Sequence, residues 1–199
     1  MPIPESKSEV RARARQTWAQ IMQEPRTPDT VEATLDQAFR SFLQSQQHRK
    51  NDAICLAFHA MGAEFNVLKP LKEEGWSVAL PLVLPGFRLS FHLYLKAGKE
   101  VLSLEKGAFG IMEPGAGSPI LEPRKDDILL VPTLAANARG FRLGKGGGFY
   151  DRLMDINPFH QMEKWAILPE NLMEAGFVEE PHDLRLNKII TEERIATYP

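Results

Sequence analysis

Residues 140–152 hold the side chains best suited to chemistry in this 199-residue chain. Four glycines fall within five positions there, and the missing side chains let backbone amides come close to an anion. Arg142 and Lys145 add two cationic donors, and the segment runs into an expected helix whose first N–H groups favour negative charge. The pattern predicts a phosphate-binding loop. The glycines are Gly144, Gly146, Gly147 and Gly148.

This loop matches neither of the common nucleotide-binding motifs. A Walker loop needs Gly five residues before its Gly-Lys pair and Ser or Thr after it, and Arg139 and Gly146 stand at those positions. The Gly-x-Gly-x-x-Gly dinucleotide pattern fits in no register. A flexible, glycine-rich surface turn therefore remains an alternative interpretation.

Two aspartates are candidate magnesium ligands. Asp151 follows the loop directly, where it would either stabilise the start of a helix or bind Mg²⁺ beside a phosphate. Asp183 offers a second carboxylate, but its spacing in the sequence does not connect it to the loop.

Lys7 and Arg11 form a basic pair on the first expected helix. They lie one helical turn apart, at the border of the apolar stripe that Val10 and Ala14 begin, so they could lean over a groove. By themselves they are more typical of a solvated helix face.

Composition limits the possible functions. The net charge of −2 argues against a nucleic-acid-binding protein. The chain shows no signal peptide and no apolar run long enough for a membrane span. Cys55, the single cysteine, lies in an apolar run and is expected to be a buried core residue in a reducing cytoplasm.

The elements that position these residues alternate between strands and helices. A Ser6–Glu9 capping box opens the first helix, and Asp29 or Thr30 caps the second. Such alternation predicts an α/β fold: an open, mostly parallel sheet sandwiched by helices in three Rossmann-like layers, with ligands at the carboxyl ends of the strands. The expected strands are 53–58, 77–81, 88–95 with one wet face, 127–132, 165–168 and 188–191; the expected short helices are 66–74 and 149–156, and 107–123 is expected to be a loop.

The segment from Arg142 to Arg152 resembles the signature Arg-Leu-Gly-x-Gly-x-Gly-[YF]-Tyr-Asp of the 5-formyltetrahydrofolate cyclo-ligase family. Shorter elements resemble that family in the same order along nearly the whole chain. They are Lys7 with Arg11, Glu64 after the first strand, Phe109-Gly110-Ile111-Met112-Glu113-Pro114, Pro181-His182-Asp183 and Ile189-Ile190-Thr191-Glu192.

The resemblance implies an ATP-dependent ligase that converts 5-formyltetrahydrofolate to 5,10-methenyltetrahydrofolate, with Mg²⁺ as the metal. It implies a cytoplasmic monomer of one domain, residues 1–199, that binds neither nucleic acid nor membranes. Arg142, Lys145 and Tyr150 would be catalytic, and Asp151 and Asp183 would serve magnesium. The implied ATP contacts are Lys7, Arg11, Arg142, Gly144, Lys145, Gly146, Gly147, Gly148 and Phe149, and the implied folate contacts are Glu64, Phe109 and Tyr150.

The chain departs from the family pattern before the glycine loop, at Ala136 and Asn137, and after Glu64, at Asn66 and Val67. A C-terminal Gln of the family has no clear match in residues 168–172. These departures concern the folate pocket more than ATP binding. Two alternatives stay open: a non-catalytic paralogue that binds folate or nucleotide, and a sugar-phosphate-handling enzyme on a related fold that needs no ATP.

Overall fold

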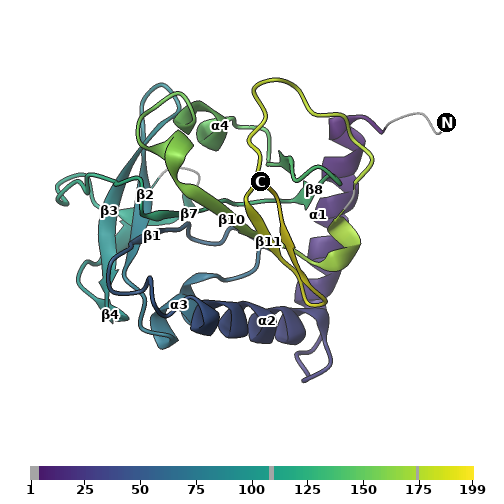
Figure 1. Ribbon diagram of the computed structural model, residues 1–199, viewed down its shortest axis with the longest axis horizontal. Coiled ribbons are helices and arrows are strands. Elements are labelled where there is room, and N and C mark those ends of the chain that lie inside the picture. Colours follow the sequence, from purple (N-terminus) through teal and green to yellow (C-terminus); the bar gives the residue numbers. More distant parts are fainter. Residues whose placement is uncertain (1–4, 108–109, 174) are drawn as a thin grey trace.

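The computed structural model describes residues 5–107, 110–173 and 175–199, built around an eight-stranded sheet (Figure 1). The strand order is β12-β11-β10-β7-β1-β2-β3-β4. Neighbours from β11 to β2 pair in parallel, whereas β12, β3 and β4 add antiparallel edges, so the predicted open, mostly parallel sheet is confirmed. The bounds are β1 Cys55–Leu56, β2 Val78–Leu84, β3 Arg88–Lys96, β4 Lys99–Glu100, β7 Ile128–Leu130, β10 Glu163–Ile167, β11 Lys188–Ile190 and β12 Ile195–Thr197.

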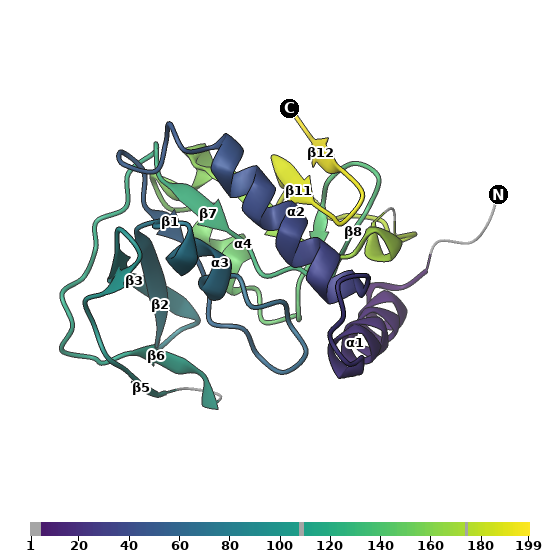
Figure 2. The ribbon, with the colours of Figure 1, turned by 90° about the horizontal axis from the view of Figure 1, so that it is seen from below.

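The helices surround this sheet. In Figure 2, α2 and α3 lie across one face of the sheet, while Figure 1 shows α4 on the opposite side. The bounds are α1 Lys7–Gln23, α2 Val31–Ser45, α3 Leu68–Glu73 and α4 Phe149–Leu153, with 3-10 turns at Phe159–Gln161 and Glu170–Leu172. Two small ribbons complete the fold: β5 Leu104–Lys106 with β6 Met112–Pro114, and β8 Ala135–Ala136 with β9 Arg142–Leu143.

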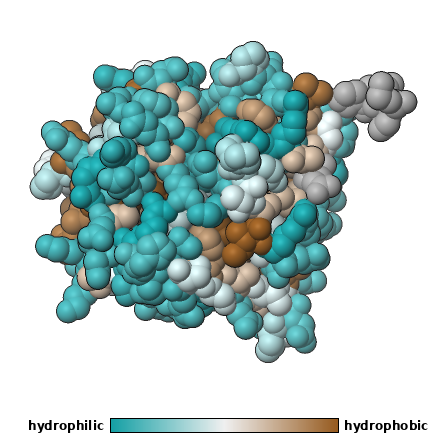
Figure 3. All heavy atoms as spheres, in the orientation of Figure 1, coloured by the Kyte–Doolittle hydropathy of each residue, from teal (hydrophilic) through white to brown (hydrophobic). Residues whose placement is uncertain are grey.

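The surface in Figure 3 is mostly hydrophilic, with apolar residues scattered between polar ones on the face shown. No helix in the described part of the chain is both long enough and apolar enough to cross a membrane.

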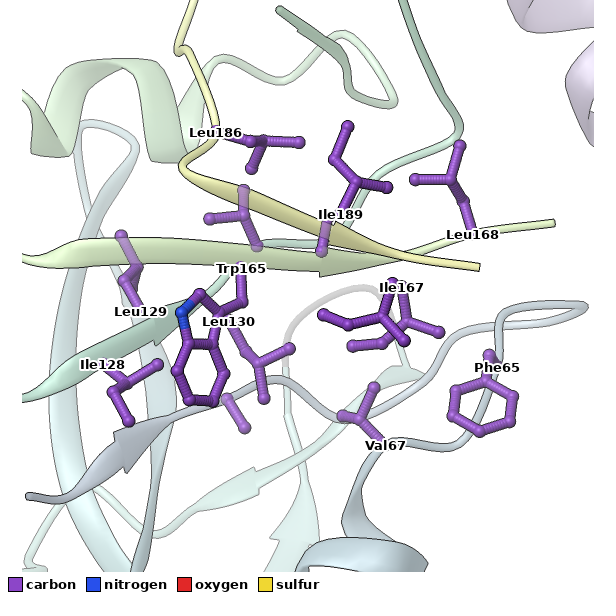
Figure 4. Close-up of a cluster of buried hydrophobic side chains, with 14 of the residues drawn as sticks. Phe65, Val67, Ile128, Leu129, Leu130, Trp165, Ile167, Leu168, Leu186 and Ile189 are labelled. Carbon is purple, nitrogen blue, oxygen red and sulfur yellow. The ribbon is translucent and has the colours of Figure 1, made fainter. Parts of the chain in front are cut away.

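The core includes buried side chains from the sheet and from the helices packed around it. Figure 4 shows part of it, where residues of β7, β10 and β11 meet Phe65 and Val67. The side chains of β7 are fully buried, as expected for a parallel strand covered on both faces. Trp165 of β10 meets the ring of Phe42 at 4.7 Å between centroids, edge to face. Burial of side chains of this size contributes about 1.5–3 kcal/mol each, and it holds the carboxyl ends of the parallel strands in fixed positions.

Helix α1 stands beyond the carboxyl end of β7. Its predicted capping box is present, with Ser6 N–H donating to the Glu9 carboxylate at 2.9 Å. The predicted apolar stripe is buried, and Trp18 Nε1 donates to the Leu134 carbonyl at 3.3 Å. These contacts place the N-terminal turn of α1 next to the segment that follows β7.

Three expectations about local structure were wrong. Residues 107–123 are not all loop, because the Gly107 N–H donates to the Ile111 carbonyl at 2.8 Å and a hairpin pairs β5 with β6. The wet face expected for 88–95 is partly covered: His92 is buried, with one ring nitrogen 3.0 Å from the Pro119 carbonyl. The helix expected at 149–156 ends at Leu153.

Candidate active site

A cavity of about 1230 Å³ opens at the carboxyl ends of β1 and β7. Ligand pockets are usually about 300–1,000 Å³, so this space can take more than one small molecule. The residues after β1 and β7 form its floor, and the glycine loop, the first turns of α1 and the segment 180–185 form its polar side. As predicted for this sheet type, the glycine loop lies at the carboxyl side of the β7 strand.

Backbone pairing brings the C-terminal segment to the glycine loop. The Arg142 N–H donates to the Leu184 carbonyl at 3.1 Å, and Phe141 bridges to Arg185. The Leu184 N–H in turn reaches Asp151 Oδ1 at 3.4 Å. Asp183 therefore lies beside Asp151, a proximity that their separation in the sequence did not reveal.

Arg142 is the most buried cation of the cavity. Its side chain is 4% exposed, and Nη2 donates to Asp151 Oδ1 at 2.8 Å. Burial lowers the pKa of the Arg142 guanidinium, while the Asp151 charge opposes that shift. Its buried Nε has no hydrogen-bond partner among the described residues, and an unpaired donor of this kind suits an anionic ligand.

Lys7 and Arg11 reach the same cavity from α1. Lys7 Nζ contacts Asp183 Oδ2 and Glu180 Oε2, both at 2.6 Å, and Arg11 Nε donates to the Gly144 carbonyl at 2.9 Å. Burial by itself would lower the pKa of Lys7, but the two carboxylates outweigh it and raise that pKa. Lys7 and Arg11 therefore do not lie on a solvated helix face, which was the alternative interpretation of this basic pair.

Lys145 is paired with a residue that the resemblance assigns to folate. Its Nζ lies 2.9 Å from Glu64 Oε1, and Glu64 Oε2 accepts the Met61 N–H at 2.7 Å. The two residues come from the glycine loop and from the loop after β1, which meet across the mouth of the cavity.

The carboxylates have the chemistry that Mg²⁺ prefers. Asp151 and Asp183 both line the cavity and offer hard oxygen atoms. Among the described residues, Glu180, His182 and Asp183 form a group whose possible ligand atoms lie within 4.8 Å of one another. Each aspartate uses one oxygen for a cation, and neither Asp151 Oδ2 nor Asp183 Oδ1 accepts a hydrogen bond from the residues that the structure describes. Burial would raise the pKa of Asp183, but the hydrogen bond from Lys7 holds it below its usual range, so this carboxylate is charged at neutral pH.

The loop glycines make room for neighbouring side chains as well as for a ligand. A Cβ at Gly144 would lie 2.1 Å from Arg142 Nη1, and one at Gly148 would lie 2.9 Å from Arg152 Nη1. Gly148 also has a φ of +67°, which strains residues with a Cβ. The guanidinium groups of Arg142 and Arg152 pack against this backbone. The loop is therefore ordered by side-chain contacts and is not a loose surface turn.

Two aromatic residues follow the loop. Tyr150 is 8% exposed and lies below the Arg142 guanidinium at 5.8 Å. Burial raises the pKa of its phenol, which therefore stays protonated near neutral pH. Phe149 meets the ring of Phe87 at 5.5 Å. Phe109, the remaining aromatic candidate, lies outside the described residues.

The positions that depart from the family pattern do not line the cavity. Val67 and Ala136 are core residues, and Asn137 caps the turn between β8 and β9 by accepting the Arg139 and Phe141 N–H groups, both at 3.0 Å. These departures from the family pattern therefore do not change the described residues that line the cavity.

Several residues that line the cavity had no role in the sequence-based prediction, among them Phe87, Arg152 and Glu180. Arg152 belongs to the motif, but its type alone does not distinguish a surface arginine from a ligand contact. Phe87 lies in a turn and Glu180 in an irregular segment, where no periodicity indicates which way a side chain points.

Known proteins resemble this chain over nearly its whole length. The model of the 5-formyltetrahydrofolate cyclo-ligase family matches residues 3–192. A 5-formyltetrahydrofolate cyclo-ligase of Mycolicibacterium smegmatis is 29% identical, with 96% of each chain covered. One from Haemophilus influenzae is 32% identical over 56% of this chain and 59% of its own.

Solved structures agree. The NMR structure of Aquifex aeolicus 5,10-methenyltetrahydrofolate synthetase has a TM-score of 0.74 and 25% identity, over 96% of this chain and 92% of its own. The Mycoplasma pneumoniae 5,10-methenyltetrahydrofolate synthetase has a TM-score of 0.67 and 21% identity, over 94% of this chain and 99% of its own, which supports the fold.

Proposed function

Since the chain belongs to the 5-formyltetrahydrofolate cyclo-ligase family, we propose that it converts 5-formyltetrahydrofolate and ATP into 5,10-methenyltetrahydrofolate, ADP and phosphate. The main support is the meeting of four cations, from α1 and from the glycine loop, on one side of a cavity with room for two ligands. A sugar-phosphate enzyme would give no reason for two of those cations to come from α1.

The ATP phosphates would bind at the polar side of the cavity. Lys7, Arg11, Arg142 and Lys145 supply positive charge there, and the N–H groups of residues 144–149 can donate to phosphate oxygens. Three of these cations now bind carboxylates: Lys7 to Asp183 and Glu180, Arg142 to Asp151, and Lys145 to Glu64.

Asp151 and Asp183 would hold Mg²⁺ through their second carboxylate oxygens. The metal supplies Lewis-acid stabilisation of the phosphate charge. Each aspartate keeps a cation on its first oxygen, and this contact fixes its orientation before a ligand arrives.

The chemistry overcomes a poor leaving group. The formyl oxygen attacks the γ-phosphorus of ATP. The bond between the γ-phosphorus and the β,γ-bridging oxygen breaks, and ADP leaves. Nitrogen 10 then attacks the formyl carbon and loses its proton, the carbon–oxygen bond breaks, and phosphate departs. Arg142 and Lys145 would stabilise charge on the transferring phosphoryl group. Tyr150, whose phenol is protonated, would donate a hydrogen bond near the formyl group, and Glu64 would position the folate.

The proposal extends to the state of the enzyme. We propose that residues 1–199 act as one catalytic domain, as a monomer in the cytoplasm. The single cysteine, Cys55, is buried and free, as is usual in a reducing compartment. Size-exclusion chromatography with light scattering tests the monomer.

The decisive experiment mixes purified protein, 5-formyltetrahydrofolate and Mg-ATP and follows the absorbance of the methenyl product. The expected result is product formation that stops when ATP or Mg²⁺ is omitted. Product without ATP, or none in the complete mixture, contradicts the proposal. If both ligands bind in calorimetry but no product forms, the chain is a non-catalytic paralogue.

A further inference from the structure

Phe87 occupies an unusual position at the tip of the β2–β3 hairpin. It has a φ of +58°, in a region where hairpins favour Gly or Asn and bulky residues are rare. Its side chain lines the cavity and is also 53% exposed. A large apolar ring that is held in a strained backbone and left half open to solvent needs a reason beyond folding.

Two neighbours hold this ring in place. The ring of Phe149 lies 5.5 Å away at an interplanar angle of 58°, and the guanidinium of Arg152 lies 5.0 Å above the Phe87 centroid. The hairpin tip and the start of α4 therefore form one rim of the cavity, which we call the aromatic rim (Phe87, Phe149 and Arg152).

Arg152 presents a cation at this rim that the protein does not neutralise. Its Nη1 donates to the Gly147 carbonyl at 2.9 Å, and no carboxylate of the described residues forms an ion pair with it. Gly148, which has no Cβ, leaves the space that this guanidinium occupies. Lys7, Arg142 and Lys145 differ, since each already binds a carboxylate.

The wall behind the aromatic rim is mainly apolar. Pro81, Val83, Leu89 and Ile111 line it, mostly from the same two strands that carry the hairpin tip, and the buried Glu113 beside them accepts the Val83 N–H at 3.4 Å. A ring system suits this wall better than a triphosphate does. The rim is also open to solvent, as a substrate with a long charged tail requires.

We propose that the aromatic rim binds the p-aminobenzoylglutamate half of the substrate: Phe87 stacks on the benzoyl ring, and Arg152 pairs with a glutamate carboxylate. This inference rests on the proposed cyclo-ligase function. The pterin then lies deeper, against the apolar wall, and the N5 formyl group faces the glycine loop. Stacking on an aromatic face and pairing with a guanidinium are the interactions these two ligand groups favour.

The test compares two substrates: 5-formyltetrahydrofolate and an analogue in which a neutral alkyl amide replaces glutamate. Parent enzyme should show a KM about tenfold lower for the natural substrate, from one charge-assisted contact. In Arg152→Met that preference should collapse to about twofold or less, with the KM for ATP unchanged. Arg88→Met is the matched control, since Arg88 is exposed on the same hairpin but does not line the cavity.

Phe87→Leu tests the stacking contact. It should raise the KM and the dissociation constant for both folate substrates by about five- to tenfold, and Phe87→Tyr should restore both. If Phe87→Leu raises the KM for ATP and leaves folate binding normal, the ring stacks on adenine and the stacking part of the proposal is wrong. If Arg152→Met keeps the parental preference for the glutamate-containing substrate, the pairing of Arg152 with the glutamate carboxylate is wrong.

Equilibrium binding of both folates, followed by protein fluorescence, gives a readout independent of turnover, and thermal melts confirm folding. If parent enzyme forms no product yet binds folate with the expected preference, the proposed reaction fails and the rim assignment stands. If it turns over both substrates equally well, only the rim assignment fails.

Discussion

The two sides of the cavity differ in how their charges are balanced before any ligand binds. On the polar side, Lys7, Arg142 and Lys145 each bind a carboxylate of the protein. Arg11, on the same side, contacts the Gly144 carbonyl and no carboxylate of the described residues. At the aromatic rim, Arg152 likewise contacts a carbonyl and a ring among the described residues. Ligand binding to Lys7, Arg142 or Lys145 therefore exchanges ion partners, whereas binding to Arg152 adds a partner. A substitution of one of these three paired cations removes a ligand contact and also leaves a carboxylate without its cation.

The largest effect should follow from Arg142→Met. The variant removes the most buried cation and leaves Asp151 unpaired beside the phosphates, so we expect kcat/KM to fall about a thousandfold or more. Arg142→Lys should recover only part of this loss, because an ammonium lacks the planar fork. Arg139→Met, which removes an exposed arginine paired with Glu179, is the control and should stay near parent. Activity of Arg142→Met within tenfold of parent would exclude Arg142 from the phosphoryl-transfer site.

Asp151→Asn should separate turnover from folate binding. An amide keeps the shape but loses the charge that a magnesium ligand needs, so we expect kcat to fall about a hundredfold and the Mg²⁺ requirement to rise. Folate affinity should change by less than about twofold, because the aromatic rim is untouched. Steady-state kinetics over a magnesium titration, with fluorescence binding of folate, measure both. Unchanged turnover with unchanged magnesium dependence would remove Asp151 from the metal site.

Lys7→Ala and Lys145→Ala should each raise the KM for ATP by about tenfold, the lower end expected for a charge-assisted contact. The Lys7 result is the more informative, because Lys7 lies on α1, far from the glycine loop in sequence. Glu180→Gln is the matched control: it relieves one ion pair of Lys7 and should leave the KM for ATP equal to or below that of parent. If Lys7→Ala behaves like parent while Lys145→Ala is impaired, the ATP site does not extend to α1.

The smallest effect is the pH dependence of stability from the Lys7–Asp183 pair. The folded pKa of Asp183 is lowered, so its stabilisation is present above the unfolded value of about 3.9 and is lost as pH falls through the folded pKa. The pKa of Lys7 is raised, so its stabilisation is present below about pH 10.4 and is lost as pH rises through the folded pKa. The melting temperatures of parent and Lys7→Met should differ by a few degrees at most between about pH 5 and 9, and should begin to converge only as pH falls below about 4 towards the lowered pKa of Asp183. A constant difference down to about pH 2 would show that the pair contributes nothing through ionisation.

Local patterns in the sequence were enough to predict most of the elements. The Ser6–Glu9 box, the apolar stripe of α1 and the buried run at 127–132 each depend on contacts between near neighbours, and all three are present in the structure. The glycine motif could likewise be recognised from the sequence, because its residues lie in one continuous stretch, and it carried the family resemblance. The buried His92 escaped prediction because a later segment, at Pro119, covers it. The β5–β6 hairpin is local, but it escaped prediction because the Gly- and Pro-rich composition of 107–123 indicated a loop.

Only the tertiary structure decided which side chains meet. Asp183 joins Asp151 because residues 141–142 pair with 184–185, a contact between segments more than forty residues apart. Lys7 reaches the same point because Trp18 and its neighbours anchor α1 beyond β7. The sequence by itself determined the central strands of the sheet, the position of the glycine loop in the chain, and the family. The ion pairs of the polar side and the aromatic rim arose from long-range packing, which no local spacing encodes.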